Sequence, residues 1–277
     1  MTDRARPQRV PDPTVAFWIL KILTTGVGEV FSDFLVKTFD PVIVVLIAAV
    51  AFAGVAAVQL TARRYVPWRY WLFVFSVAVF GTMIADVAHL VIGIPYVVTT
   101  TMFALVLLAI FVVWRQREGT LSVHSIDTSR REVFYWLTVS ATFALGTAVG
   151  DFSATTAGLG FLDSGLVFLA LFAVPGILRL LGLPATAAFW WAYILTRPLG
   201  ASFADWLALP PARGGLDLGY LQISGVGTAL LAIGIIVLQV RSRRRAPAEL
   251  DAAHSEGAHS EGGTRGLRDE PGELWTV

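Results

Sequence analysis

Long apolar stretches separated by short polar breaks occupy the chain from residue 15 to residue 240. Each stretch holds about 20 residues, the length that an α-helix needs to cross the hydrocarbon core of a bilayer. The pattern predicts eight transmembrane helices, at 15–36, 42–62, 68–91, 96–114, 132–153, 164–183, 186–208 and 219–240. Pro175 and Gly176 lie inside the sixth stretch, where we expect a kink. The predicted fold class is an all-α integral membrane bundle.

Every second stretch carries one motif: an aromatic pair that ends in Trp, a Gly ten residues after the Trp, and an Asp five residues after the Gly. The four copies are Phe17-Trp18 with Gly28 and Asp33, Tyr70-Trp71 with Gly81 and Asp86, Tyr135-Trp136 with Gly146 and Asp151, and Phe189-Trp190 with Gly200 and Asp205. At these glycines the two halves of the chain are offset by 118 or 119 residues. The motif predicts four parallel two-helix repeats with internal pseudo-symmetry.

The repeats also divide the chain into segments. We predict a cytoplasmic N-terminal segment at 1–13, a first membrane half with repeats 1 and 2 at 14–127, a second half with repeats 3 and 4 at 128–243, and a disordered cytoplasmic tail at 244–277. Two spans make up each repeat, so all four motif helices run in the same direction. We expect them to form a ring in which the motif glycines permit close helix packing.

Basic residues between the spans indicate the orientation. The loops on the side of the N-terminus hold 15 of them, whereas the opposite loops hold Lys37 and Arg213. By the positive-inside rule we expect an inner-membrane protein with both termini in the cytoplasm. We expect the aromatic pairs to lie at the cytoplasmic interface, as aromatic belts do. At 1.5 Å per residue, each Asp lies about 22 Å further along its helix.

Composition narrows the classes of function. Charged residues make up 15% of the chain and mean hydropathy is +0.68, whereas soluble domains carry about 25% charged residues. A net charge of +1 gives no reason to expect a nucleic-acid partner. The chain has no Cys, which excludes thiolate chemistry. His89 is the one histidine in a predicted span, so paired-histidine haem binding is not expected. We predict no cofactor and no enzymatic activity.

Polar side chains of the motif helices are the candidate site. An ionisable group inside a span costs about 2.5–3.5 kcal/mol on insertion scales, and such groups usually face a bundle interior or a wet cavity. Residues four apart share a helix face, and superposing the four faces gives one polar track. Its acids are Glu29, Asp33, Asp86, Asp151 and Asp205, its hydroxyls are Thr25, Thr82 and Thr147, and its charge-compensating bases are Lys21 and Arg197.

The excess of acids over bases in this track predicts a path for a small cation. Carboxylate and hydroxyl oxygens suit hard ions such as Mg²⁺, Ca²⁺ or Mn²⁺. Asp33, Asp86, Asp151 and Asp205 are therefore candidate metal ligands. Closely spaced buried carboxylates also favour proton uptake, which makes proton-coupled transport a second form of the same hypothesis.

Other interpretations stay open at this point. Gly and Asp of the motif could serve helix packing, while Lys21 and Arg197 neutralise two of the acids. The many aromatic residues could line a cavity for a larger organic solute, and an accessory or sensory membrane protein is a further alternative. The expected partners are the lipid bilayer and a small cation or other small solute, and a homo-oligomer is compatible with the sequence.

Four segments carry a resemblance to a known family: KILTTGVGEVFSD at 21–33, GTMIAD at 81–86, GTAVGD at 146–151 and FWWAYILTRPLGASFADW at 189–206. On these segments the sequence resembles a family of bacterial uncharacterised membrane-anchored proteins built from a short repeat of unknown function. The resemblance covers the whole membrane region. It implies a repeat architecture and no particular activity.

Overall fold

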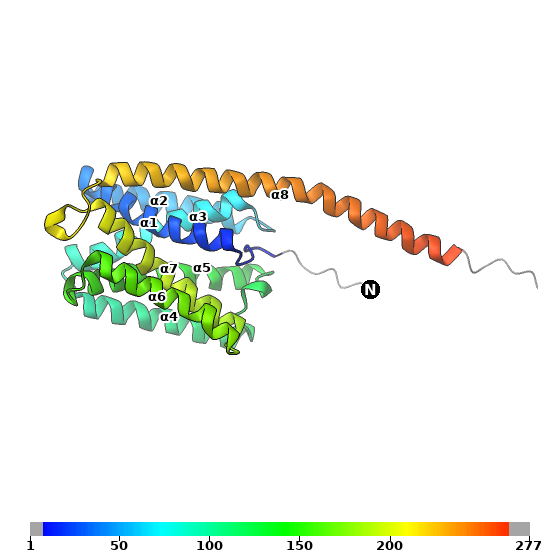
Figure 1. Cartoon of the computed structure of the whole chain (residues 1–277), viewed down its shortest axis with the longest axis horizontal. Helices are drawn as coiled ribbons and strands as arrows, with labels where there is room; N and C mark the ends of the chain where they lie inside the picture. Colours follow the sequence, from blue (N-terminus) through cyan, green and yellow to red (C-terminus); the bar gives the residue numbers. More distant parts are fainter. Residues whose placement is uncertain (1–7, 266–277) are drawn as a thin grey trace, which may run out of the picture. The chain divides into compact units, whose positions relative to one another are not determined.

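A computed structural model describes the backbone of residues 8–265 and the side chains of residues 8–243 other than Leu90. Its long helices, drawn in Figure 1, are α1 (Val15–Thr38), α2 (Pro41–Leu60), α3 (Pro67–Asp86), α4 (Tyr96–Glu118), α5 (Ser129–Asp151), α6 (Gly160–Leu180), α7 (Ala185–Ala208) and α8 (Tyr220–Arg265). The described range contains no β-strand. Residues up to Ile235 form one compact unit, and those from Ile236 form a second.

Helix starts follow from local chemistry. Asp40 accepts bonds from the backbone N–H groups of Val42 and Ile43, at 2.9 and 3.1 Å, and Pro41 is the first residue of α2. A side-chain oxygen at this position satisfies N–H groups that have no partner within the helix. Thr14 and Thr128 cap α1 and α5 in the same way. The predicted boundaries are therefore close to the observed ones.

Two motif helices end in a turn of π-helix that the sequence pattern did not predict. The turn η1 (Val87–Val91) follows Asp86 directly, and η3 (Phe152–Thr156) follows Asp151. The helices α1 and α7 have no such turn after Asp33 and Asp205. A π-turn is a local irregularity in hydrogen bonding, and hydrophobic periodicity does not reveal it. Repeats 2 and 3 thus differ from repeats 1 and 4 in the turn that follows the motif Asp.

Seven of the eight helices are long and apolar enough to cross a membrane, so the chain is a multi-pass membrane protein. The helix that does not meet this standard is α7. It contains Arg197 and Asp205, and 15 of its 24 residues are buried. In α2, by contrast, only Val44 and Gln59 are buried. Polar residues are tolerated in α7 because protein surrounds it.

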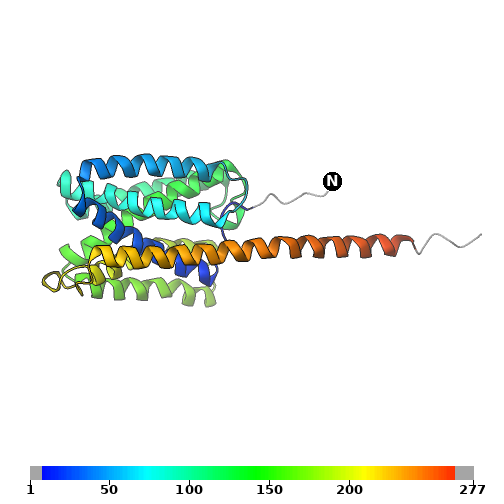
Figure 2. The same ribbon diagram turned by 90° about the horizontal axis from the view of Figure 1, so that it is seen from above.

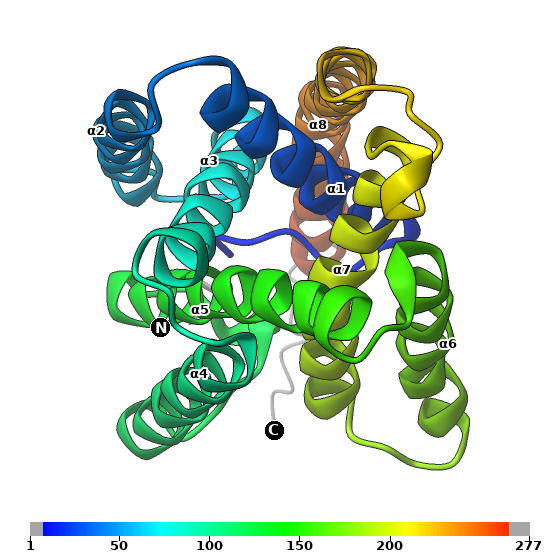
Figure 3. The same cartoon turned by 90° about the vertical axis from the view of Figure 1, so that its left-hand side faces the viewer.

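The four motif helices form a closed inner ring in the order α1, α3, α5, α7 (Figure 3). Each motif glycine lies where its helix meets the next one. A methyl group added at Gly81 would lie 3.1 Å from Cβ of Phe143, and one at Gly200 would lie 2.9 Å from the backbone N of Gly26. Gly28 meets Ala78, and Gly146 meets the side chain of Arg197. The glycines thus permit close approach around the whole ring.

The second helix of each repeat packs outside the ring, on the motif helix of the next repeat. Figure 2 shows α2, in blue, beside α3, in cyan. The pairs α4 with α5 and α6 with α7 repeat this arrangement. The first part of α8 completes it, because Gly227 contacts Val27 of α1 and Gly234 contacts Leu20. Every repeat is therefore completed by its neighbour.

The helix α8 extends further than the sequence pattern indicates. The last span was predicted to end near residue 240 and a disordered tail to begin at 244, whereas the structure describes helix as far as Arg265. Residues 246–253 include four Ala, which have high helix propensity, and also Pro247, which disfavours the interior of a helix. The remainder of the predicted tail, 266–277, lies outside the described residues.

Candidate functional site

A cavity of about 400 Å³ lies at the end of the ring where the motif helices reach their Asp residues, here called the aspartate end. The opposite end, where these helices begin, is called the tryptophan end. All five predicted acids line the cavity: Glu29, Asp33, Asp86, Asp151 and Asp205. They come from all four motif helices. The polar track expected from helical spacing therefore becomes one acidic cavity.

Three of these carboxylates converge at its base. Glu29, Asp151 and Asp205 each have one carboxylate oxygen within 4.8 Å of the others. Glu29 is 3% exposed and Asp205 is 6% exposed. Carboxylates this close and this buried repel one another strongly unless a proton or a cation lies between them. The cluster is thus suited to binding a positive charge.

One acid at the cavity wall already has a cationic partner. Nζ of Lys37 lies 2.6 Å from Oδ2 of Asp33 and 2.6 Å from the hydroxyl oxygen of Tyr220. Lys37 was assigned only to an outer loop, although its place four residues after Asp33 puts the two on one helix face. In the described part of the chain, no ion pair joins Asp86, Asp151 or Asp205 to a base. The cavity keeps the negative excess that the sequence predicted.

Below the cavity, Arg197 projects from α7 into the middle of the ring. It is fully buried, and its guanidinium donates to Glu29, to the hydroxyl of Thr82, to the hydroxyl of Thr147 at 2.6 Å, and to the carbonyl of Thr25 at 3.0 Å. Thr82 also donates to Glu29 at 3.1 Å. Charge-assisted hydrogen bonds of this kind can hold a buried ion pair, and among the described residues only Nε of the guanidinium lacks a partner. Every other motif helix contributes at least one partner.

The repeat explains why these partners meet. Glu29, Thr82 and Thr147 each follow directly after a motif glycine, and the fourth copy has Ala201 there. Since the four motif helices are arranged in a ring, these positions lie at one level. Arg197, one turn earlier in the fourth copy, fills the space that Ala201 leaves. Arg197, which the sequence predicted to compensate an acid, forms an ion pair with Glu29.

Lys21 occupies a different environment from the one expected for a compensating base. Its side chain is fully buried, and no carboxylate lies within ion-pair distance in the described chain. Nζ lies 4.0 Å from the ring centre of Phe143 and 4.3 Å from that of Tyr193, and no described residue is its hydrogen-bond partner. Helical spacing placed Lys21 on the correct face, but two turns away from Glu29 it does not reach that acid.

Aromatic rings close the tryptophan end. The first residue of each motif pair packs against the Trp of the next repeat around the ring. The four contacts, between ring centres, are Phe17 to Trp71 at 5.7 Å, Tyr70 to Trp136 at 5.3 Å, Tyr135 to Trp190 at 6.0 Å and Phe189 to Trp18 at 5.6 Å. Seven of the eight residues are buried, and Trp18 is partly buried.

This aromatic layer corrects the expectation of a belt at the lipid interface. Aromatic belts lie on the outside of a bundle, whereas these rings face one another and the hydroxyls of Tyr70 and Tyr135 are 2.5 Å apart. Spacing along a helix gives depth but not the direction in which a neighbour lies. Trp68 and Trp191, which are 42% and 39% exposed, are better placed for lipid contact.

A strap formed by residues 8–14 covers the aromatic layer and connects both halves of the chain. The backbone N–H of Tyr65 donates to the carbonyl of Gln8 at 2.9 Å, and that of Arg9 donates to the carbonyl of Ile126 at 3.0 Å. The guanidinium of Arg9 lies 2.7 Å from Glu132, which is fully buried. In Figure 3 the strap, in dark blue, crosses behind the ring.

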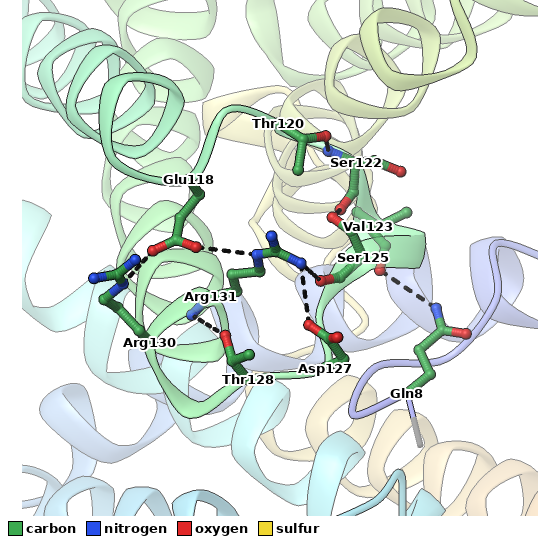
Figure 4. A network of polar contacts seen from close by, with 10 residues as sticks. All are labelled: Gln8, Glu118, Thr120, Ser122, Val123, Ser125, Asp127, Thr128, Arg130 and Arg131. Atoms are coloured by element: carbon green, nitrogen blue, oxygen red, sulfur yellow. Dashed lines mark hydrogen bonds and ion pairs between the residues drawn. The ribbon is translucent and has the colours of Figure 1, made fainter. Parts of the chain in front are cut away.

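The linker between α4 and α5 holds the strap in place (Figure 4). Glu118 accepts bonds from Arg130 and, at 3.0 Å, from Arg131, which also reaches Asp127 at 3.1 Å. The side-chain amide of Gln8 donates to the carbonyl of Val123 at 3.3 Å. The tryptophan end thus has a polar layer outside its aromatic layer.

The candidate residues therefore separate into three levels along the ring axis. The five acids line the cavity, Thr25, Thr82, Thr147 and Arg197 form its floor with Glu29, and Lys21 lies beneath. Lys37 and Tyr220 at the wall, and Tyr96 beside Asp151 in the cavity lining, were not predicted. Tyr96 and Tyr220 belong to outer helices, whose faces the motif does not describe.

Comparison with known proteins gives a family and no activity. No curated protein and no solved structure matches the chain. One family model, described as Repeat of Unknown Function (DUF347), matches it four times, at residues 16–65, 69–120, 134–181 and 188–245. Each match spans one motif helix and the helix after it. With most of its length accounted for by these four copies, the chain belongs to the family of the Repeat of Unknown Function (DUF347).

Proposed function

We propose that the protein is a membrane carrier for a small cation, which binds in the acidic cavity. The observation that carries the proposal is the convergence of five acids from four repeats on one cavity, three of them without a basic partner in the described chain. A cluster of like charges in low dielectric is costly. Binding a cation removes that cost, so the cavity has affinity for positive charge.

The donor atoms favour a hard divalent ion as the cargo. Ca²⁺ takes oxygen ligands at about 2.3–2.6 Å, so oxygens on opposite sides of the ion lie about 5 Å apart. The carboxylate oxygens of Glu29, Asp151 and Asp205, within 4.8 Å of one another, meet that limit. Asp86 lines the same cavity and supplies a further carboxylate. Mg²⁺ and Mn²⁺ use the same oxygen donors with shorter bonds.

The closed tryptophan end favours a carrier over a channel. Below the acids, the path meets the Arg197 cluster, the buried Lys21 and then the aromatic layer. A cation in transit would have to pass two buried bases and a layer of packed rings. Net transport therefore requires a second conformation, in which the aromatic layer opens and the acidic cavity is closed to its present side.

The membrane arrangement forms part of the proposal. All eight helices cross the membrane as four pseudo-symmetric repeats, with α7 shielded from lipid by its neighbours. The excess of basic residues supports an orientation in the inner membrane with the tryptophan end and both termini on the cytoplasmic side. The acidic cavity then opens to the opposite side. A negative cavity at that mouth attracts cations from solution.

A larger organic cation is the second candidate, and the size of the cavity favours it. A volume of about 400 Å³ exceeds what one bare ion occupies and falls within the range of pockets for small molecules. Tyr96, Phe161 and Tyr220 contribute aromatic surface to its lining. Aromatic faces bind organic ammonium groups through cation–π contacts.

Flux into liposomes tests the proposal. Purified protein is reconstituted, and uptake of Mn²⁺, Ca²⁺, K⁺ and H⁺ is compared between wild type and the double variant Asp86→Asn with Asp151→Asn. The matched control is Asp163→Asn, an exposed acid of α6 outside the cavity. We expect divalent flux in wild type and control and none in the double variant.

Two outcomes would redirect the proposal. Flux that persists in the double variant would rule out the acidic cavity as the route. If no ion is transported but a quaternary ammonium compound is taken up or bound, the cargo is an organic cation. Absence of both activities would favour an accessory role, with the repeated Asp serving the fold.

A further inference from the structure

Lys21 has a buried titratable group that does not line the acidic cavity and has no part in the cation binding proposed above. It lies between the Arg197 cluster and the aromatic layer, with an exposed fraction of 0%. Among the described residues its Nζ has no hydrogen-bond partner, and the ring centres of Phe143 and Tyr193 lie 4.0 and 4.3 Å away. A lysine in the middle of a transmembrane bundle is costly to keep unless it has a purpose.

In the part of the chain that the structure describes, the groups that face Lys21 from the neighbouring helices include no free anion. From α7 come Tyr193 and the guanidinium of Arg197, which lies over the same Phe143 ring, with Cζ 5.4 Å from the ring centre. The phenol of Tyr135 comes from α5, its ring 6.4 Å from that of Tyr193, and beyond it is Tyr70 of α3. The nearest acid along its own helix, Glu29, is bound to Arg197.

This environment favours the uncharged form of the amine. An ammonium group that leaves water without an anion loses its hydration, and cation–π contacts with two rings return only part of that loss. The neighbouring guanidinium, which keeps its charge in proteins, adds repulsion. An amine, by contrast, retains a lone pair that can accept a proton when water reaches it.

We propose that Lys21 is a proton-binding site that couples cation transport to proton movement in the opposite direction. In the conformation described here Nζ is an amine. When the aromatic layer opens and water reaches Lys21, Nζ accepts a proton from water to form a hydrated ammonium ion. The proton returns to water on the way back, so the net change over one cycle is one proton moved.

The coupling follows from charge. A proton on Lys21 adds a positive charge beneath the acidic cavity, and the repulsion between that charge and a cation in the cavity weakens cation binding. By thermodynamic reciprocity a bound cation weakens proton binding equally. Exchange of a cation for a proton is the result. The coupling rests on the proposed function, but the charge state of Lys21 does not.

The chain offers a direct measurement of that charge state, because Lys21 and Lys37 are its two lysines. Full-length protein labelled with ¹³Cε lysine in lipid nanodiscs gives one NMR signal from each, and Lys37→Arg assigns them. Lys37, paired with Asp33, is the internal reference for an ammonium group. We expect Lys21 to show the chemical shift of an amine near neutral pH. An ammonium shift for Lys21 from weakly acidic to weakly alkaline pH would overturn the proposal.

Transport measurements then test the coupling. In liposomes, cation uptake by wild type is expected to rise when the two sides differ in pH and to acidify the side that loses cation. In Lys21→Met the response to the pH difference is lost, and in Lys21→Arg, which cannot lose its charge, uptake falls at every pH. A pH response that persists in Lys21→Met overturns the coupling. If wild type transports nothing, the proposed function fails while the NMR result still decides the proton site.

Discussion

The two ends of the inner ring are built from the same four-fold repeat and have opposite properties. At the tryptophan end, four aromatic pairs pack ring against ring and close the bundle. At the aspartate end, four Asp and Glu29 line a cavity of about 400 Å³. Apolar side chains brought together by a repeat attract one another through burial, whereas like charges repel and leave a space. Repetition thus produces a seal or a binding cavity according to the side chain repeated.

Arg197 marks the boundary between these ends, and its removal is expected to have the largest effect. Arg197→Met leaves the buried carboxylate of Glu29 without a basic partner, which costs about 3–5 kcal/mol in typical buried pairs. Thermal unfolding of the purified protein measures the loss. Adding Glu29→Gln to this variant removes the unpaired charge and should restore part of the stability. A double variant no more stable than Arg197→Met would contradict the ion-pair account.

Close packing between the two ends can be broken at a single glycine. In Gly146→Ala the added methyl group would meet the side chain of Arg197 and Cδ of Pro198, the latter at 2.9 Å. Overpacking of this kind costs about 1–3 kcal/mol. Gly176→Ala is the matched control, because nothing lies within 4 Å of its added carbon. Equal unfolding temperatures for the two variants would show that the ring is not tightly packed at this level.

At the tryptophan end, the contribution of the strap can be tested through its ion pair. Arg9→Gln removes the ion pair to buried Glu132, and a hydrogen bond to a charged group is worth about 1.5–3 kcal/mol. We expect faster hydrogen exchange at the amides of Arg9 and Tyr65, whose backbone bonds hold the strap. Arg117→Gln, at an exposed position of α4, should change neither amide. Unchanged exchange in Arg9→Gln would mean that the backbone bonds suffice.

The smallest effect is expected at the rim of the cavity. Lys37 is half exposed and paired with Asp33, and exposed ion pairs contribute about 0–1 kcal/mol. Lys37→Met makes the cavity more negative, so Mn²⁺ should bind up to about fivefold more tightly at low ionic strength. Lys37→Arg keeps the charge and serves as the control. Weaker binding in Lys37→Met, or an effect that salt does not reduce, would show a role beyond charge.

Sequence periodicity predicted most of the fold because bilayer length and helical repeat leave few choices. It predicted the helices, the four repeats and the acids that meet in the cavity, since residues four apart must share a face. It did not predict that Lys21 lies apart from every acid. Helical spacing shows which side chains share a face of one helix, but it does not show their partners on other helices, such as Phe143 and Tyr193.

The same limit applies to the aromatic pairs and to the cavity wall. A position near the start of a transmembrane helix indicates a depth close to the membrane interface. Whether Trp71 or Trp136 faces lipid depends on which helix lies beside it. Tyr96 and Tyr220 were missed because outer helices carry no shared motif. Of the residues that were missed, only Lys37 could have been found from the sequence, because it lies four residues after Asp33.

The ion pair between Arg197 and Glu29 also sets a condition on biosynthesis. Its two residues are 168 positions apart, and ribosomes add roughly 5–20 residues per second, so α1 is made roughly ten to thirty seconds before its counter-ion exists. During that interval α1 carries its two buried ionisable residues, Lys21 and Glu29, without their final neighbours. The first helix to emerge therefore depends on the seventh for stable residence in the bilayer. Truncated chains that stop before α7 should be retained by insertion machinery or degraded, whereas chains that include it can complete the ring.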